Sequence, residues 1–132
     1  MKQKTVLQAK RLGIEGCSAD DRLGPIARRM ADDDISALVV VDDEGFLRGI
    51  ITRSDLLRAY ANDRQWKAKP VGDYMTSDVI TVGPETSLSD VVATLTARNV
   101  HRLVVVRQEM GKERPIAVIS DSDLVCDMAD DL

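Results

Sequence analysis

Two short stretches of the chain place a carboxylate three residues after a hydroxyl side chain, at the end of an apolar run. Thr52 precedes Asp55 in the first stretch, and Ser120 precedes Asp123 in the second, 68 positions further along the chain. An apolar, β-branched run followed by a capping residue predicts a buried strand that turns directly into a helix. The start of a helix attracts anions, because its first N–H groups lack helical partners and the helix dipole is positive there.

The first stretch has the side chains to hold a phosphorylated ribose. Asp55 could accept two hydrogen bonds from the two hydroxyls of a ribose, because a carboxylate is a pure acceptor. Thr52 would cap the helix beside a bound phosphate, and Arg53 would place a cation next to it. These residue types predict a nucleotide site at the junction of strand and helix.

The same pattern has a purely structural interpretation. Thr-x-x-Asp before an apolar helix is an ordinary capping box, in which the two residues satisfy each other's backbone N–H groups. A duplicated structural cap would look the same in the sequence as a duplicated binding site. Both interpretations stay open at this point.

The pair His101 and Arg102 is the other candidate for phosphate contact. It lies between a predicted helix and a predicted strand and offers two donors side by side. A single histidine before an apolar run is more often a packed or solvated residue than a ligand. The corresponding positions in the first half of the chain, 65 residues earlier, hold Ser36 and Ala37, so only the second half carries this charge.

Metal and catalytic chemistry are not predicted. The acidic runs at 32–34 and 130–131 leave a divalent-metal sensor as a further alternative, but such runs are typical of solvated helix ends. Cys17 and Cys126 stand alone and are predicted to be buried, reduced thiols. The one histidine has no nucleophile or carboxylate at a diagnostic spacing, so we expect no enzyme, no catalytic residue, no metal and no catalytic cofactor.

The elements that would hold the two stretches follow from periodicity. In the first half, a helix is predicted from Leu23 after a short strand at 14–17, and strands 38–41 and 46–51 form a hairpin around 42–45. The second half repeats this order, with a strand at 79–82, a helix capped at Ser87 and a strand at 103–106. Asp34 and Asn99 are predicted to be left-handed helix ends at equivalent positions.

Composition fits a small soluble pair of repeats. The chain has 132 residues, of which 44% are hydrophobic and only four aromatic, so an aliphatic core is expected. We predict an α/β (α+β) fold of two β-α-β-β-α repeats packed as a pseudo-twofold pair. The predicted boundaries are 1–62 for the first repeat with an N-terminal segment that includes a short helix, 63–72 for a linker and 73–132 for the second repeat.

Charge and hydropathy argue against a membrane span, a secretory signal and a nucleic-acid surface. The longest apolar run, 37–41, is far shorter than the roughly 20 residues of a membrane span. The N-terminal residues lack the apolar core of a secretory signal, so a cytoplasmic protein is expected. The net charge of −4 argues against a nucleic-acid surface, which relies on clustered basic residues.

As a set, several motifs resemble a tandem pair of CBS domains, the Bateman module, over nearly the whole chain. The motifs are the stretch 73–76 leading into 79–82, the stretch 99–106 and the two strand-to-helix junctions. The resemblance implies a regulatory module that binds an adenosyl compound of the AMP, ADP or ATP class, or S-adenosylmethionine, in a cleft between the repeats. It also implies a homodimer, an unknown effector protein reached in trans, and no chemistry of its own.

The resemblance also assigns roles to residues. The junction carboxylate would hold the ribose and the junction hydroxyl would meet phosphate, first-strand residues would line the base, and the His-Arg pair would reach phosphates. The implied residues are Thr52, Arg53, Asp55, Ile80, Thr81, His101, Arg102, Ser120 and Asp123, with Glu15 and Gly16 as weaker equivalents of the base-lining pair.

The two junctions differ in charge. Asp121 stands where the first junction has Arg53, so a carboxylate would oppose a polyanion there. We therefore expect one competent site, at Thr52, Arg53 and Asp55, and a less charged ligand or none at the second junction. The alternative function is a structural dimerisation or interaction module with empty clefts.

Overall fold

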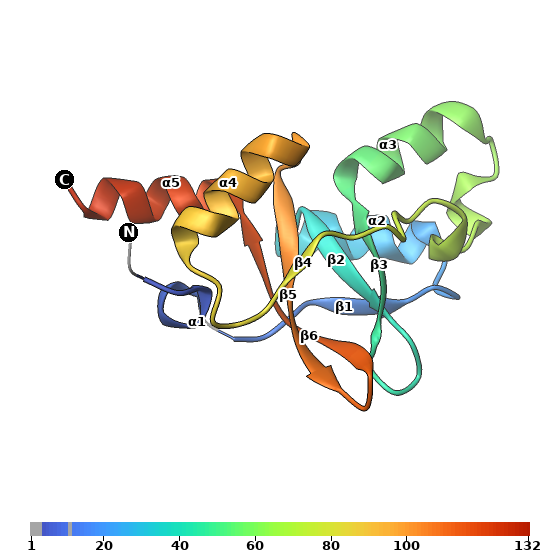
Figure 1. The fold of residues 1–132 in the computed structure, drawn as a ribbon. Coiled ribbons are helices and arrows are strands. Elements are labelled where there is room, and N and C mark those ends of the chain that lie inside the picture. Colours follow the sequence, from blue (N-terminus) through green and yellow to red (C-terminus); the bar gives the residue numbers. More distant parts are fainter. Residues whose placement is uncertain (1–3, 11) are drawn as a thin grey trace. The chain divides into compact units, whose positions relative to one another are not determined.

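The computed structural model describes residues 4–10 and 12–132, which form two compact units (Figure 1). We call Glu15–Val79 the first unit, and we call Ile80–Leu132 together with the described residues up to Ile14 the second unit. Residues 1–3 and 11 of the predicted N-terminal segment lie outside the described part of the chain.

The first unit is a three-stranded sheet with two α-helices and two 3-10 turns. The sheet has the order β1-β2-β3, with β1 parallel to β2 and β2 antiparallel to β3. In chain order the elements are β1 (Gly16–Ser18), α2 (Leu23–Asp33), β2 (Ala37–Val41), β3 (Leu47–Thr52), α3 (Arg53–Asn62), η1 (Trp66–Ala68) and η2 (Val71–Asp73).

The second unit repeats this sheet and its two helices. Its sheet has the order β4-β5-β6, with the same parallel and antiparallel pairings, and the N-terminal helix α1 packs on it. The elements are α1 (Val6–Ala9), β4 (Thr81–Val82), α4 (Leu88–Arg98), β5 (Arg102–Glu109), β6 (Lys112–Ser120) and α5 (Asp121–Asp130). The predicted β-α-β-β-α order is confirmed in both halves.

The predicted helix ends are confirmed. Helix α2 begins at Leu23, and its C-cap Asp34 is left-handed with φ 53° and ψ 49°. Helix α4 is capped by Ser87, whose hydroxyl accepts from Asp90 N, and its C-cap Asn99 has φ 52° and ψ 48°. A left-handed cap turns the chain sharply toward the next strand, so both repeats use the same turn between helix and strand.

The hairpin of the second unit is longer than the sequence suggested. We predicted a strand at 103–106, whereas β5 and β6 pair from Arg102↔Ser120 out to Glu109↔Lys112. The positive φ angles of Met110 (56°) and Gly111 (75°) fit a tight two-residue turn. Pro115 lies within β6 beside a register shift, where a missing N–H is tolerated.

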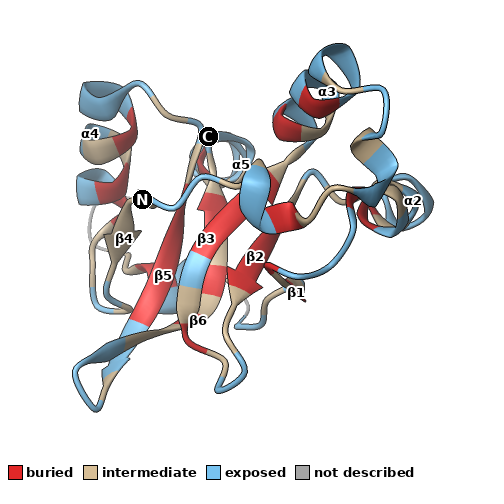
Figure 2. Ribbon diagram, turned by 90° about the vertical axis from the view of Figure 1, so that its right-hand side faces the viewer, coloured by how far each residue is buried: buried red, intermediate tan, exposed pale blue. Residues whose placement is uncertain are grey.

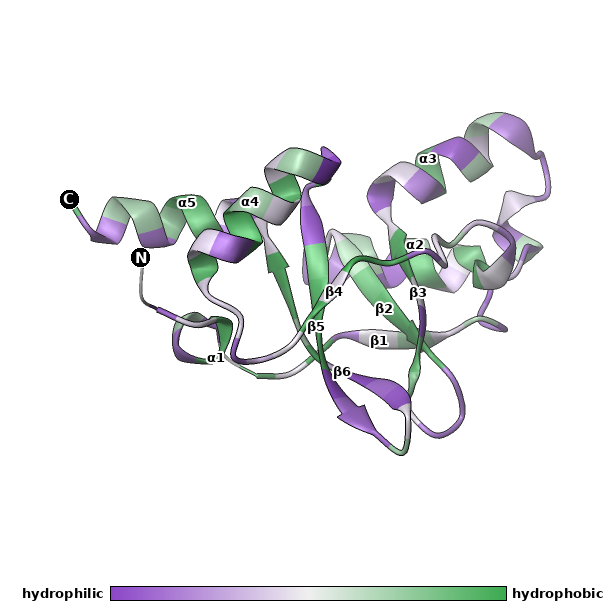
Figure 3. Ribbon diagram, in the orientation of Figure 1, coloured by the Kyte–Doolittle hydropathy of each residue, from purple (hydrophilic) through white to green (hydrophobic). Residues whose placement is uncertain are grey.

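Both cores are aliphatic, as predicted. Buried residues concentrate on the central strands, over the hydrophobic stretches 38–40 of β2 and 103–106 of β5 (Figures 2 and 3). A strand flanked on both sides within a sheet and buried on both faces is expected to be continuously apolar. The fully buried side chains include Leu38, Val39, Val40, Leu103, Val104 and Val105.

We predicted that the N-terminal segment packs with the first repeat, but it packs with the second unit. Val6 is only 1% exposed within that core, and its N–H donates to Thr86 O at 2.9 Å. Leu88 N, at the start of α4, donates to Lys4 O at 2.9 Å. The segment adds an apolar side chain to a core that the second repeat alone would leave partly open.

The predicted linker and the stretch that follows it pack on the first unit. Val71 is fully buried in the first core, and Ile50 and Thr76 exchange two backbone hydrogen bonds of 2.9 Å. Gly49 allows this close approach, because a Cβ there would lie 2.6 Å from Thr76 O. Residues 63–72 are therefore part of the first unit rather than a free connector.

The two cysteines differ, although we had predicted that both are buried. Cys17 lies in the first core, and burial is the main reason why its pKa is raised to about 11. Cys126 on α5 is exposed. Helical periodicity did not show that Cys126 lies away from the apolar face of α5.

Among the described residues, no helix is long and apolar enough to cross a membrane.

The packing of the N-terminal segment predicts a stability effect at Val6. Val6→Ala should lower the free energy of unfolding by about 1.5 to 3 kcal/mol, because it removes two buried carbons and leaves a cavity. Leu7→Ala is the matched control, since Leu7 is 43% exposed and its loss should change stability by about 0.5 kcal/mol or less. Urea unfolding measures both. Equal effects of the two substitutions would contradict the assignment of this segment to the second unit.

Candidate functional site

The first junction is a closed capping box. Thr52, the last residue of β3, is the N-cap of α3, and its Oγ1 accepts from Asp55 N at 3.4 Å. In return, Asp55 Oδ2 accepts from Thr52 N at 2.8 Å and from Thr52 Oγ1 at 3.0 Å. The capping interpretation of this motif is therefore confirmed. The two hydrogen bonds from Thr52 hold the Asp55 carboxylate in one place.

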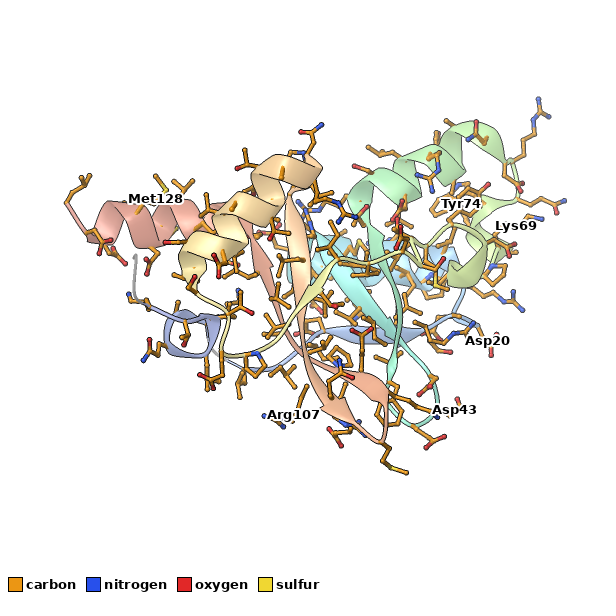
Figure 4. All side chains as sticks on the ribbon, viewed as in Figure 1. Asp20, Asp43, Lys69, Tyr74, Arg107 and Met128 are labelled. Atoms are coloured by element: carbon orange, nitrogen blue, oxygen red, sulfur yellow. The ribbon has the colours of Figure 1, made fainter. Side chains whose placement is uncertain are left out.

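Asp55 is buried and bound on both of its carboxylate oxygens. It is 4% exposed and is the one charged residue in the described part of the chain that ranks as buried. Its Oδ1 accepts from Arg58 Nη1 at 3.1 Å, while Arg58 Nη2 donates to Tyr74 O at 3.0 Å. The Arg58 guanidinium also lies 5.8 Å from the centre of the Tyr74 ring, on the segment after α3 (Figure 4). Burying a carboxylate requires such a cation.

The second junction repeats the box with a different cation. Ser120 Oγ accepts from Asp123 N at 3.3 Å, and Asp123 Oδ2 accepts from Ser120 N at 2.9 Å and from Ser120 Oγ at 3.2 Å. Lys10 Nζ, from the N-terminal segment, donates to the same Oδ2 at 3.0 Å. The side chain of Asp123 is 35% exposed, against 6% for Asp55.

The protonation of Asp123 follows from these contacts. Burial acts to raise the pKa of its carboxyl, but the hydrogen bonds from Ser120 and Lys10 outweigh burial and leave the pKa below its ordinary value. Asp123 is therefore an anion at neutral pH and acts as a hydrogen-bond acceptor only.

The N–H groups at the two helix starts are less available than the sequence suggested. Arg53 N donates to Ser36 O at 3.1 Å, and Asp121 N donates to His101 O at 2.8 Å, at equivalent positions of the two units. Ser122 N donates to Asp121 Oδ1 at 2.7 Å. Together with the caps, these bonds use the first three helical N–H groups of α5, so that helix start has little remaining capacity for a phosphate.

An exposed pair of polar side chains flanks each junction. The first helical residue is the basic member, Arg53, in the first unit and the acidic member, Asp121, in the second. In the first unit Arg53 Nη2 donates to Asp34 Oδ1 at 2.9 Å, and Arg53 is 53% exposed. In the second unit His101 Nδ1 lies 3.1 Å from Asp121 Oδ2, with His101 78% exposed. Exposed pairs of this kind contribute little stability, so the Arg53 or His101 side chain can turn toward a ligand without a large loss.

The structure brings most of the predicted residues of the second unit to one corner of its sheet. Arg102, the first residue of β5, pairs in register with Ser120, and His101 precedes it. Thr81 lies outside this corner, because it pairs with Val104, two residues further along β5, and its hydroxyl donates at 2.9 Å to Glu113 Oε2, seven residues before Ser120 on β6.

Other predicted residues lie apart from that corner. Ile80 O accepts from Val104 N at 3.0 Å, while the Ile80 side chain packs against the second core. In the first unit, Glu15 is paired with Arg29 at 2.8 Å beside β1, which begins at Gly16. Thr52, Arg53 and Asp55 form their own group in that unit.

Two functional candidates were missed by the sequence analysis. Arg58 could have been found, because it lies one helical turn after Asp55 and the spacing i, i+3 places side chains on one face. Lys10 could not, because it reaches Asp123 across 113 positions of sequence.

A cavity of about 180 Å³ adjoins the Lys10–Asp123 pair in the second unit. Among the described residues, no cluster of three or more His, Cys, Asp or Glu is placed to hold a metal ion.

Comparisons with known proteins agree with these repeats. The family model of the CBS domain matches residues 14–62 and 71–130. The chain is 35% identical over 107 residues to inosine-5'-monophosphate dehydrogenase from Nitrosopumilus maritimus, a match that covers 76% of this chain and 21% of that protein. The chain thus spans about a fifth of that relative's length.

Solved structures share the fold over nearly the whole chain. The crystal structure of the CBS domain NE2398 is 32% identical with a TM-score of 0.81, covering 96% of this chain and 98% of that one. The CBS domain pair of protein MJ0100, in complex with 5'-methylthioadenosine and S-adenosyl-L-methionine, is 22% identical with a TM-score of 0.81 and covers 98% of both chains. The second likeness shows the fold alone.

The pKa of Asp123 predicts how stability depends on pH. A carboxyl whose pKa is lowered in the folded state stabilises the protein above its unfolded pKa of about 3.9, and this contribution is lost as the pH falls through the lower folded value. Asp123→Asn should lose this acid-dependent part. It should also be less stable by about 1 kcal/mol at pH 7, because the capping box is weakened.

Thermal unfolding between pH 2 and pH 7 measures both effects. Asp43→Asn, in the exposed turn between β2 and β3, is the matched control for loss of one carboxylate and should follow the wild-type pH profile. A pH profile of Asp123→Asn that coincides with the wild type would overturn the assignment of Asp123 as a stabilising anion.

Proposed function

Because the chain belongs to the CBS domain family, we propose that it is a regulatory module that senses an adenosyl compound through its strand-to-helix junctions. The bound ligand would change how the chain engages an effector protein in trans. The observation that carries this proposal is the pair of closed capping boxes, each of which holds a carboxylate next to an exposed pair of polar side chains, Arg53 with Asp34 and His101 with Asp121.

The chemistry of the junctions fits a ribose. A ribose offers two neighbouring hydroxyl donors, and an ionised carboxylate offers only acceptors, so the two are complementary. Asp123 is the more accessible of the two junction carboxylates, with a side chain that is 35% exposed. Each carboxylate is already oriented by its own capping box, which reduces the entropy lost when a ligand binds.

The charge at each junction favours a different ligand. Arg53 beside the first junction favours a phosphorylated compound of the AMP, ADP or ATP class. At the second junction Asp121 accompanies Asp123, and the first helical N–H groups already have acceptors. We therefore propose that the second junction takes an adenosyl compound without phosphate, with adenosine as the simplest member.

The alternative function is a structural interaction module, and one observation favours it. Helices α3 and α5 expose large apolar side chains at equivalent positions, 68 residues apart: Leu57 (71%) and Tyr60 (70%) on α3, and Val125 (60%) and Met128 (51%) on α5. Figure 4 labels Met128 on α5. Exposed apolar residues that recur in both units fit a protein contact, and we propose a homodimer formed through these helix faces.

Ligand-induced stabilisation tests the sensor. The thermal unfolding midpoint should rise with at least one of AMP, ADP, ATP, NAD, adenosine and S-adenosylmethionine, because a ligand at 100 times its dissociation constant adds about 2.7 kcal/mol. Asp55→Asn should abolish the response to phosphorylated compounds, and Asp123→Asn the response to adenosine.

Asp43→Asn, which lies in a hairpin turn, is the control and should respond like the wild type. A panel in which no compound moves the midpoint by more than its experimental error would reject the sensor in favour of the interaction module.

Sedimentation velocity tests the homodimer. Leu57→Ser combined with Val125→Ser should shift a dimer toward monomer, because both side chains are more than half exposed in the isolated chain. The same change should alter the free energy of unfolding of the monomer by only about 0.5 kcal/mol or less. Met110→Asn, at the hairpin tip with Met110 92% exposed, is the control and should leave the oligomer unchanged. A wild-type protein that sediments as a monomer at high concentration would contradict the dimer.

A further inference from the structure

The two junction carboxylates obtain their cations from different parts of the chain. Asp55 is paired with Arg58, one turn further along the same helix. The position equivalent to Arg58 in the second unit, 68 residues later, is Cys126, which carries no positive charge. Lys10 of the N-terminal segment supplies the missing cation to Asp123. A cation that comes from outside the helix can move independently of it.

Lys10 uses the acceptor capacity that a ribose would need. Asp123 Oδ2 already receives the Ser120 N–H and hydroxyl, and Lys10 Nζ is its third donor at 3.0 Å. An ammonium group only donates hydrogen bonds, and so do the ribose hydroxyls toward a carboxylate. A ribose that engages both oxygens of Asp123 therefore competes with Lys10.

The backbone that carries Lys10 is fixed on both sides. Leu7 N donates to Pro84 O at 3.2 Å, Lys10 N donates to Val6 O at 2.9 Å, and Gly13 N donates to Ile116 O at 2.7 Å. The side chain of Lys10 is nevertheless 32% exposed and has four rotatable bonds. The ammonium group can thus change its partner while the segment stays docked.

Asp127, which lines the same cavity as Lys10, carries a second carboxylate, one oxygen of which lacks a donor in the described part of the chain. Asp127 Oδ2 is buried and has no hydrogen-bond donor among the described residues, while its other oxygen, Oδ1, pairs with Lys4 at 2.9 Å. A buried carboxylate oxygen without a donor lowers stability, so a donor that moved there would be favoured. The cavity of about 180 Å³ is lined by Lys10, Asp123 and Asp127, together with Ala9, Leu88, Ile119, Leu124, Cys126 and Asp130.

We propose that Lys10 is a two-position gate for the second junction. Without ligand its ammonium group pairs with Asp123; when the hydroxyls of an adenosyl ligand bind Asp123, the ammonium group moves to Asp127 Oδ2. This inference rests on the proposed function, because it needs a ligand at Asp123. The gate makes Lys10 a specificity-determining residue: a ligand must offer donors good enough to displace an ammonium group.

The gate also makes the two junctions unequal. At the first junction Arg58 occupies Asp55 Oδ1 and leaves Oδ2 to the capping box, so no cation shares that oxygen with Thr52. At the second junction the cation and the capping residue share one oxygen. Ligand binding at Asp123 is therefore coupled to the position of Lys10, whereas binding at Asp55 is not.

Removing the gate should strengthen binding. Isothermal titration with adenosine should show about threefold to fivefold tighter binding to Lys10→Met than to the wild type, which corresponds to the loss of one partly exposed ion pair as competitor. Lys69→Met removes the same charge from the Lys69–Asp63 pair of the first unit (Lys69 is labelled in Figure 4) and should leave the adenosine affinity unchanged. In an Asp123→Asn background, Lys10→Met should not restore adenosine binding.

A double-mutant cycle tests the second position of the gate. Asp127→Asn should weaken adenosine binding when Lys10 is present, because the ammonium group then has a poorer place to go. In the Lys10→Met background, Asp127→Asn should weaken adenosine binding less or not at all. Effects that act through Lys4 occur in both backgrounds, so they cancel in the difference between the two. Thermal unfolding of each variant shows that it is folded.

The outcomes separate the gate from the function itself. Adenosine binding that depends on Asp123 but is equal in the wild type and Lys10→Met would overturn the gate and leave the proposed function standing. Equal weakening by Asp127→Asn in both backgrounds would overturn the second position of Lys10. Adenosine binding by neither the wild type nor Lys10→Met would overturn both the gate and the proposed ligand of the second junction.

Discussion

The hydrogen-bonded box that joins a strand to a helix is the constraint on which each unit depends. Thr52 and Asp55, and likewise Ser120 and Asp123, satisfy each other's N–H groups at the point where the chain leaves the sheet. The box holds a carboxylate at the start of the helix, beside the first residue of the central strand. Under the proposed function, the junction carboxylate would serve both as part of the cap and as the acceptor for a ligand, so one side chain would have a structural and a functional role.

A carboxylate held in such a box needs a positive charge, and the two units supply it differently. Arg58 belongs to the helix that it stabilises and contacts Asp55 together with the backbone of Tyr74. Lys10 belongs to a segment at the other end of the sequence and leaves Asp123 partly exposed. The duplicated motif therefore produces one carboxylate that is enclosed by its own unit and one whose environment can change.

The sequence predicted the repeated elements, the left-handed caps at Asp34 and Asn99, and both capping boxes, because each depends on residues within a few positions of one another. It overestimated the anion-binding capacity of the helix starts. Asp121 N finds its acceptor at His101 O, a contact set by where β5 begins relative to α5. It also placed the N-terminal segment with the wrong unit, because the burial of Val6 depends on a gap between elements that only packing reveals.

The sequence by itself determined the order of elements, the aliphatic cores and the residue types at each junction, since periodicity and capping act over one or two turns of chain. The cation that meets Asp123, by contrast, is determined by tertiary packing. Arg58 and Lys10 both carry one positive charge, yet Arg58 meets Asp55 through helical geometry, whereas Lys10 meets Asp123 through the docking of a distant segment. Contacts between residues far apart in sequence depend on how apolar surfaces pack, and local propensity does not contain that information.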